Sequence, residues 1–123
     1  MDNIVGTKYE IVFCEGAEQS LIDISQDENQ GKLKQYQVSI LHQLKKLADD
    51  HRMSSGSFVT EGLLPNGSKF SAIRKHPLRA YLWRSSKENN TFYVSHFVLK
   101  RKNKLAAADI KIVCENWVKK ENT

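Results

Sequence analysis

The basic residues of the chain are concentrated in one stretch, and they limit the chemistry that the protein can do. From Lys69 to Lys104 there are ten basic residues and one acid, Glu88, a net charge of +9 over 36 residues. The basic residues are Lys69, Arg74, Lys75, Arg79, Arg84, Lys87, Lys100, Arg101, Lys102 and Lys104. Such clustering on segments that read as strands favours binding of a polyanion such as nucleic acid. The alternative is a solvated surface that only keeps a small protein soluble.

Arg79 is the most informative of these residues. In the segment LRAYLWR (78–84) it is surrounded by apolar and aromatic side chains, so its charge needs a partner or a function. A guanidinium can hold a phosphate through two parallel hydrogen bonds. Strand alternation puts Tyr81 and Trp83 on the same face as Arg79. These aromatic side chains either stack on the bases of single-stranded RNA or belong to the core.

The two cysteines indicate neither a metal site nor a disulfide framework. Cys14 and Cys114 are 100 residues apart, and neither belongs to a Cys-x-x-Cys or Cys/His pattern. Both lie in apolar segments, which favours buried free thiols in a reducing compartment. No basic leader precedes an apolar run at the N-terminus, and no apolar stretch is long enough to cross a bilayer. We therefore expect a cytoplasmic protein with no metal, no cofactor and no membrane association.

Hydrophobic spacing predicts the helices that must position these residues. From 32 to 52 the apolar residues recur at three- and four-residue steps, which predicts the longest helix of the chain. A similar stripe predicts a helix over 106–120. Residues 16–24 are weakly helical, and the polar run 25–31 closes them with a loop.

Runs of β-branched and aromatic residues predict the strands, at 9–14, 69–74, 78–84 and 91–100. The last three are separated by short turns, which is typical of an antiparallel meander. Residues 53–68 are rich in glycine and serine and predict an irregular connection, with a strand fragment at Phe58–Thr60. Since 123 residues suffice for one core, we expect a single α+β domain over 1–123 with its helices on one side of the sheet.

The second half of the chain resembles the RelE/ParE/HigB superfamily of type II toxins. The resemblance lies in Phe70–Arg74 (FSAIR), Leu78–Trp83 (LRAYLW) and His96–Lys104 (HFVLKRKNK), followed by a helix near Ala106. In that family a strand ending in arginine turns into a second strand with another arginine. A third, hydrophobic strand then runs into a basic corner before the terminal helix. The resemblance implies a microbial-RNase-like RelE fold, with an antiparallel twisted sheet, two N-terminal helices and a C-terminal helix.

The same resemblance implies a toxin that cleaves mRNA in the ribosomal decoding site, as a metal-independent endoribonuclease (mRNA interferase). Cleavage by the 2′-hydroxyl of the RNA needs a proton acceptor, cations at the phosphate and an acid for the leaving oxygen. Arg74 and Arg79 match the two arginines of the family motif, and Arg79 is expected to contact the scissile phosphate, as is either Lys100 or Arg101. Arg74 either shares that function or forms a surface ion pair. The further RNA-binding candidates are Lys69, Lys75, Arg84, Lys102, Lys104 and Tyr81.

The chain departs from the RelE branch in two places. Phe70 and Ala72 stand where ribonuclease members carry alternating lysines, and the helix predicted over 106–120 has no tyrosine to act as general acid. HigB-like members rely on histidine instead, and imidazole titrates near neutrality. His76, in the turn between the two arginines, and His96 are therefore the candidates for proton transfer. His96 lies within a strand and can equally be a structural residue.

These departures leave two other functions open. One is a ParE-like toxin that binds gyrase without cleaving anything, and the other is a basic regulatory module that binds nucleic acid. A toxin implies a cognate antitoxin as partner, besides the ribosome and mRNA, and assembly into larger toxin-antitoxin complexes. Residues 1–31 carry a net charge of −6 and the remainder +11, so the acidic segment either receives a basic part of that partner or keeps the protein soluble.

Overall fold

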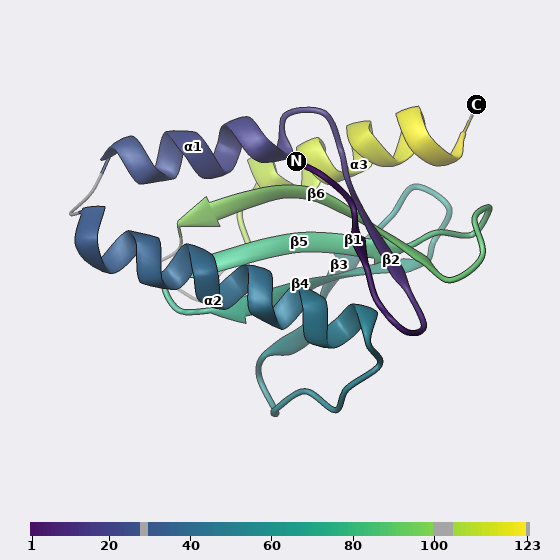
Figure 1. The fold of residues 1–123 in the computed structure, drawn as a ribbon. Coiled ribbons are helices and arrows are strands. Elements are labelled where there is room, and N and C mark those ends of the chain that lie inside the picture. The colour runs from purple at the N-terminus through teal and green to yellow at the C-terminus, as the bar shows by residue number, and fades with distance from the viewer. Residues whose placement is uncertain (28–29, 100–104, 123) are drawn as a thin grey trace.

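The computed structural model describes residues 1–27, 30–99 and 105–122, with only the backbone at residues 27 and 30–33. Within this part of the chain six strands form one mixed sheet in the order β1-β2-β6-β5-β4-β3 (Figure 1). The strands are β1 (Ile4–Val5), β2 (Glu10–Phe13), β3 (Phe58–Leu63), β4 (Lys69–Lys75), β5 (Leu78–Arg84) and β6 (Thr91–Leu99). The expected meander is confirmed as β4-β5-β6. The sheet is not antiparallel throughout, because β2 pairs with β6 in parallel.

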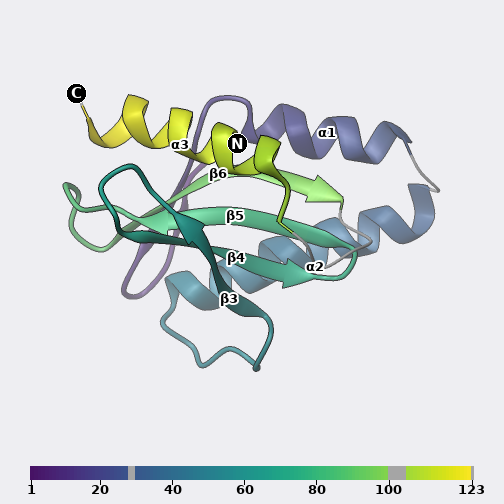
Figure 2. The same ribbon diagram turned by 180° about the vertical axis from the view of Figure 1, so that it is seen from behind.

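The described helices cover both faces of this sheet. They are α1 (Ala17–Asp27), α2 (Gln30–Ala48) and α3 (Ala107–Glu121). Figure 1 shows α1 and α2 on one side, and the reverse view in Figure 2 shows α3 lying across the other side. The prediction that the helices gather on one side is therefore wrong. An α+β architecture with two helices before the meander and one after it is what the structure contains.

The apolar pattern of the central strands explains why both faces are covered. On β5, Leu78, Ala80 and Leu82 pack in the core under α1 and α2, while Tyr81 and Trp83 pack in the core under α3. All five side chains are at most 2% exposed. A strand with apolar side chains on both of its faces needs a layer of helix on each side of the sheet. The run LRAYLWR is therefore a fully buried strand with one charge inside it, Arg79.

Two segments that the sequence predicted to be mainly irregular contain more regular structure than expected. The strand fragment predicted at Phe58–Thr60 is confirmed and extends to Leu63 as the edge strand β3, and most of the loop predicted over 25–31 is helical. At the other end α2 stops at Ala48, four residues before the predicted end. The reason is that the Ala48 carbonyl accepts hydrogen bonds from the amides of Lys8 and Tyr9 in the β1–β2 turn. Such a cap satisfies a carbonyl that the helix itself leaves open.

Candidate functional site

The β4–β5 hairpin brings the two predicted arginines together. Arg74 and Arg79 are direct partners in the antiparallel register, on either side of the turn that contains His76 and Pro77. Their side chains point to the α3 face, because they alternate along the strands with Ile73 and Leu78, which face α2. The two cations therefore lie on one surface.

A carboxylate that sequence reasoning missed lies between the two arginines. Glu61 Oε1 is 3.4 Å from Arg74 Nη2 and 3.6 Å from Arg79 Nη1. The side chains of Glu61 and Arg79 are 9% and 6% exposed, whereas that of Arg74 is 29% exposed. The signal was present in the sequence, since Glu61 is the one acid in the β-prone run FVTEGL. The argument that singled out Arg79 in LRAYLWR applies equally to Glu61.

A β-bulge directs Glu61 toward the arginines. Thr60 pairs with Ser71 and Gly62 pairs with Phe70, so Glu61 is the extra residue on β3. Such a bulge re-aims a side chain that regular alternation would place elsewhere. Gly62 is needed beside it, because a Cβ there would stand 2.7 Å from the ring of Phe70.

The arginine pair opens onto a pocket of about 310 Å³ at this end of the sheet. The lining residues are Ser55, Gly56, Ser57, Arg74, Lys75, His76, Pro77, Leu78 and Arg79. The Arg74 amide donates a 2.7 Å hydrogen bond to the Ser57 carbonyl, which holds the 55–57 segment against the hairpin. His76 is exposed in the turn, so its imidazole is available at the rim. The two guanidiniums and the imidazole line this pocket, and the Glu61 carboxylate contacts both guanidiniums from β3 without lining it. Two guanidiniums and an imidazole can together bind a phosphate and move protons.

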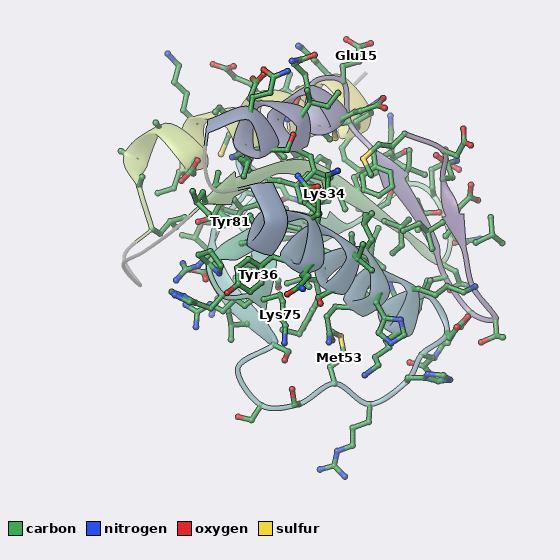
Figure 3. All side chains as sticks on the ribbon, turned by 60° about the vertical axis from the view of Figure 1, so that its left-hand side comes forward. Glu15, Lys34, Tyr36, Met53, Lys75 and Tyr81 are labelled. Carbon is green, nitrogen blue, oxygen red and sulfur yellow. The ribbon has the colours of Figure 1, made fainter. Side chains whose placement is uncertain are left out.

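Lys75 and Tyr81 were both predicted to bind RNA; Lys75 lines the same pocket as the arginines, and Tyr81 does not. Lys75 alternates to the face that α2 covers, at the end of the sheet (Figure 3). Tyr81 is fully buried in the α3-side core, so the core interpretation of this side chain is correct and it does not present a stacking surface. Burial raises the pKa of Tyr81, and the neighbouring Arg79 guanidinium offsets part of that effect.

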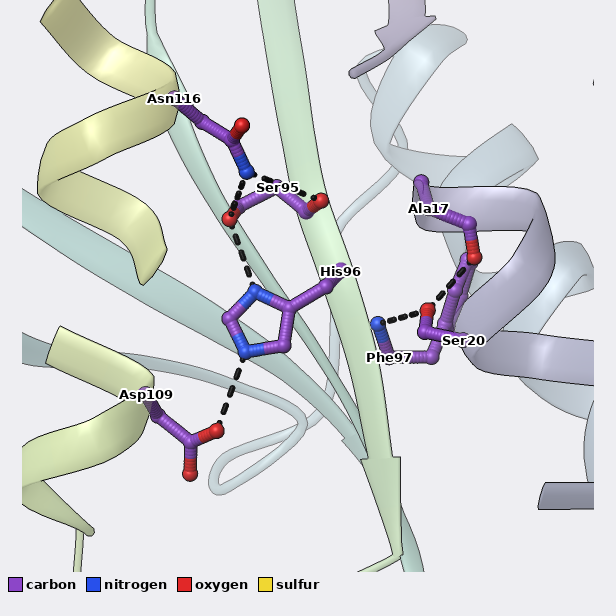
Figure 4. Close-up of polar contacts among 7 residues, drawn as sticks. All are labelled: Ala17, Ser20, Ser95, His96, Phe97, Asp109 and Asn116. Carbon is purple, nitrogen blue, oxygen red and sulfur yellow. Dashed lines mark hydrogen bonds and ion pairs between the residues drawn. The ribbon is translucent and has the colours of Figure 1, made fainter. Parts of the chain in front are cut away.

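His96 is buried within a second bulge rather than exposed at the pocket. Tyr81 pairs with His96 and Leu82 pairs with Val94, which leaves Ser95 as the extra residue and turns both Ser95 and His96 toward α3. His96 Nδ1 lies 2.8 Å from Ser95 Oγ, and His96 Nε2 lies 3.1 Å from Asp109 Oδ1 (Figure 4). Asn116 donates a 2.8 Å hydrogen bond to the same Ser95 hydroxyl. Both ring nitrogens are engaged and the residue is 6% exposed, which favours the structural interpretation of His96.

Lys69 and Arg84 lie at the opposite end of the hairpin from the arginine pair. Lys69 begins β4 and lines a separate pocket with β3 residues that include Glu61. Arg84 ends β5 with its guanidinium 5.3 Å from the ring centre of Tyr9. Five residues of strand separate Lys69 from Arg74, about 17 Å. These two basic residues therefore do not contribute to the pocket at the hairpin turn.

The predicted basic corner, Lys100, Arg101, Lys102 and Lys104, lies outside the described residues. The last described residue of β6, Leu99, is paired with Leu78, which lies next to Arg79. The chain thus leaves the sheet at the end that carries the arginine pair.

Across residues 1–27, 30–99 and 105–122, no group of three or more histidine, cysteine, aspartate or glutamate side chains is placed to hold a metal ion. None of the helices described is long and apolar enough to cross a membrane. The sequence matches no protein-family model, no curated protein and no solved structure.

Proposed function

We propose that this chain is the toxin of a type II toxin-antitoxin system, a ribosome-dependent mRNA endoribonuclease of the RelE/HigB kind that acts in the cytoplasm. The observation that carries the proposal is the pair Arg74 and Arg79, which are cross-strand partners, line one pocket and both contact Glu61. Two guanidiniums that converge on one point are suited to a phosphodiester. His76 at the rim supplies an imidazole, which can donate or accept a proton.

In the proposed reaction the RNA supplies its own nucleophile. Glu61 accepts the proton of the 2′-hydroxyl, and O2′ forms a bond to phosphorus while the bond from phosphorus to O5′ breaks. Protonated His76 donates its proton to O5′. The products are a 2′,3′-cyclic phosphate and a 5′-hydroxyl, and Arg74 and Arg79 stabilise the charge that grows on the phosphoryl oxygens. Glu61 thus takes the role of the lysines that are absent at positions 70 and 72.

The test is cleavage of mRNA in a reconstituted translation reaction, mapped by primer extension. We expect Arg79→Ala to slow cleavage by at least about 100-fold, the usual effect of removing one group that stabilises developing charge. Arg84→Ala is the matched control, because Arg84 lies on the same strand at the far end from the pocket. It should cleave within about threefold of wild type. Equal cleavage by wild type and Arg79→Ala would remove Arg79 from the mechanism.

Two further assays, of DNA breakage and of cell growth, separate the other two functions. A ParE-like toxin would leave mRNA intact and cause gyrase-dependent breaks in DNA, which would replace the ribonuclease proposal. A basic regulatory module would be harmless when it is expressed without a partner, whereas a toxin should arrest growth. For the toxin, co-expression of a cognate antitoxin that covers the basic surface should relieve the arrest, and their association should be fast and sensitive to salt.

A further inference from the structure

A chain of buried polar side chains leads from α3 toward the arginine pair. Asp109, in the first turn of α3, contacts His96, and His96 contacts Ser95, which accepts a hydrogen bond from Asn116 in the same helix (Figure 4). These four residues are at most 8% exposed. Buried polar groups of this kind add less stability than apolar packing, and a fully bonded network fixes one arrangement of the elements that it joins.

This series of contacting side chains continues from His96 through Tyr81 to Arg79. His96 and Tyr81 are paired across β6 and β5, and their ring centres are 5.4 Å apart. Tyr81 is also packed edge-on against Phe70, so its ring is held from two sides. Arg79 precedes Tyr81 by two residues on the same face of β5, so the two side chains are neighbours on the α3 side of the strand.

A second anchor of α3 lies far from the arginines and provides a comparison. At the C-terminal end of the helix, Glu121 accepts hydrogen bonds of 3.1 Å each from the Trp83 indole and the Ser86 hydroxyl. Trp83 lies next to Arg84 at the other end of β5. Both anchors join a buried carboxylate of α3 to a residue of the sheet, and only the Asp109 anchor reaches the hairpin end.

We propose that Asp109 and His96 are positioning residues for Arg79. The Asp109–His96 contact sets the position of the Tyr81 ring, and that ring sets the direction in which the Arg79 guanidinium reaches Glu61 and the pocket. The biological meaning of this inference rests on the proposed function, in which Arg79 holds the scissile phosphate. A displacement of about 1 Å in such a group is enough to lower a reaction rate by orders of magnitude.

The experiment compares Asp109→Ala and Asp109→Asn with the matched control Glu121→Ala, at a temperature where circular dichroism shows each variant folded. The first readout is the ¹⁵N resonance of the Arg79 Nε–H group, which is assigned from its loss in Arg79→Lys. The second is the affinity for inorganic phosphate, measured from the change of that resonance as phosphate is added. We expect Asp109→Ala to shift the resonance and to weaken phosphate binding about fivefold, the size of a coupling between neighbouring residues. Asp109→Asn, which keeps a hydrogen-bonding oxygen, should recover most of both. Glu121→Ala should leave both as in wild type.

The outcomes separate the inference from the proposed function. An unshifted Arg79 resonance in Asp109→Ala, or an equal shift in Glu121→Ala, overturns the positioning role whether or not the protein cleaves RNA. If Asp109→Ala does not fold, His96→Gln and Asp109→Asn report on the same resonance. A wild-type protein that fails to cleave mRNA but whose Arg79 resonance responds to Asp109→Ala alone refutes the proposed function and supports the positioning role.

Discussion

Replacing Glu61 by glutamine should lower stability and raise phosphate affinity at the same time. At distances of 3.4 and 3.6 Å, the carboxylate attracts each arginine by about 5 kcal/mol at an effective dielectric constant of about 20, before desolvation is subtracted. Removing one partner of a buried ion pair costs about 3 to 5 kcal/mol. Because the Arg74 side chain is 29% exposed and can turn to water, we expect the lower end, about 3 kcal/mol.

Urea unfolding followed by tryptophan fluorescence measures this loss. With an m-value of about 1.5 kcal/mol per molar urea, the midpoint of Glu61→Gln should fall by about 2 M. Inorganic phosphate should then recover stability in the variant, by about 2.7 kcal/mol at a concentration of 100 times its dissociation constant. Glu115→Gln, which changes an exposed acid of α3, is the control and should stay within about 0.5 kcal/mol of wild type.

The cleavage rate of Glu61→Gln should move in the opposite direction to its phosphate affinity. Loss of a general base lowers a rate by about 10² to 10⁴-fold, although the ligand is held more tightly. The reasoning is refuted if phosphate binds Glu61→Gln no more tightly than wild type, since Glu61 would then not be the group that a phosphate displaces. Tighter binding with unchanged cleavage would keep the counter-ion role and remove the role as base.

Three further outcomes follow from single contacts. Burial alone would raise the pKa of Glu121, but hydrogen bonds from an indole and from serine hydroxyls outweigh burial and lower that pKa. In urea unfolding, the stability advantage of wild type over Glu121→Gln should therefore be full above pH 4.5. It should vanish as the pH falls through the lowered pKa of the folded protein. Burial raises the pKa of Cys14 to about 12, so native protein at pH 8 should react with dithionitrobenzoate at Cys114 alone, and unfolded protein at both thiols. Gly62→Ala places a methyl group 2.7 Å from the Phe70 ring and should cost about 1 to 3 kcal/mol, seen as a lower thermal midpoint.

The pairing of the two arginines could be predicted from the sequence because a short turn fixes it. The segments on either side of His76 and Pro77 are rich in β-branched, apolar and aromatic residues, and a two-residue hairpin turn determines the register of both strands. Arg74 and Arg79 are equidistant from that turn, so they must be cross-strand neighbours. The same local pattern identified all three strands of the meander within one residue of their observed ends.

The two bulges could not be predicted, and they decide the content of the site. A bulge shifts the alternation by one residue, so the face of every residue beyond it depends on where the extra residue lies. At β3 that residue is Glu61, and at β6 it is Ser95, which carries His96 to the α3 face. Their positions follow from tertiary contacts, with Arg74 and Arg79 at one bulge and α3 at the other, which no local pattern contains. This is why His96, one of the two histidines predicted for proton transfer, is buried and why Glu61 was missed.

The charges of the arginine pair and Glu61 suit the proposed reaction better than they suit simple binding. With Glu61 ionised, the three side chains carry a net charge of +1, equal and opposite to that of a phosphodiester. When Glu61 takes the proton of the 2′-hydroxyl, the net charge becomes +2 as the phosphoryl group approaches a dianion. The electrostatic match thus improves on the way to the transition state, which is the condition for a higher rate rather than tighter binding. In Glu61→Gln the net charge of the three side chains is fixed at +2. The variant should therefore bind the uncleaved phosphodiester more tightly, and its electrostatic attraction should gain nothing further from proton transfer as the reaction proceeds.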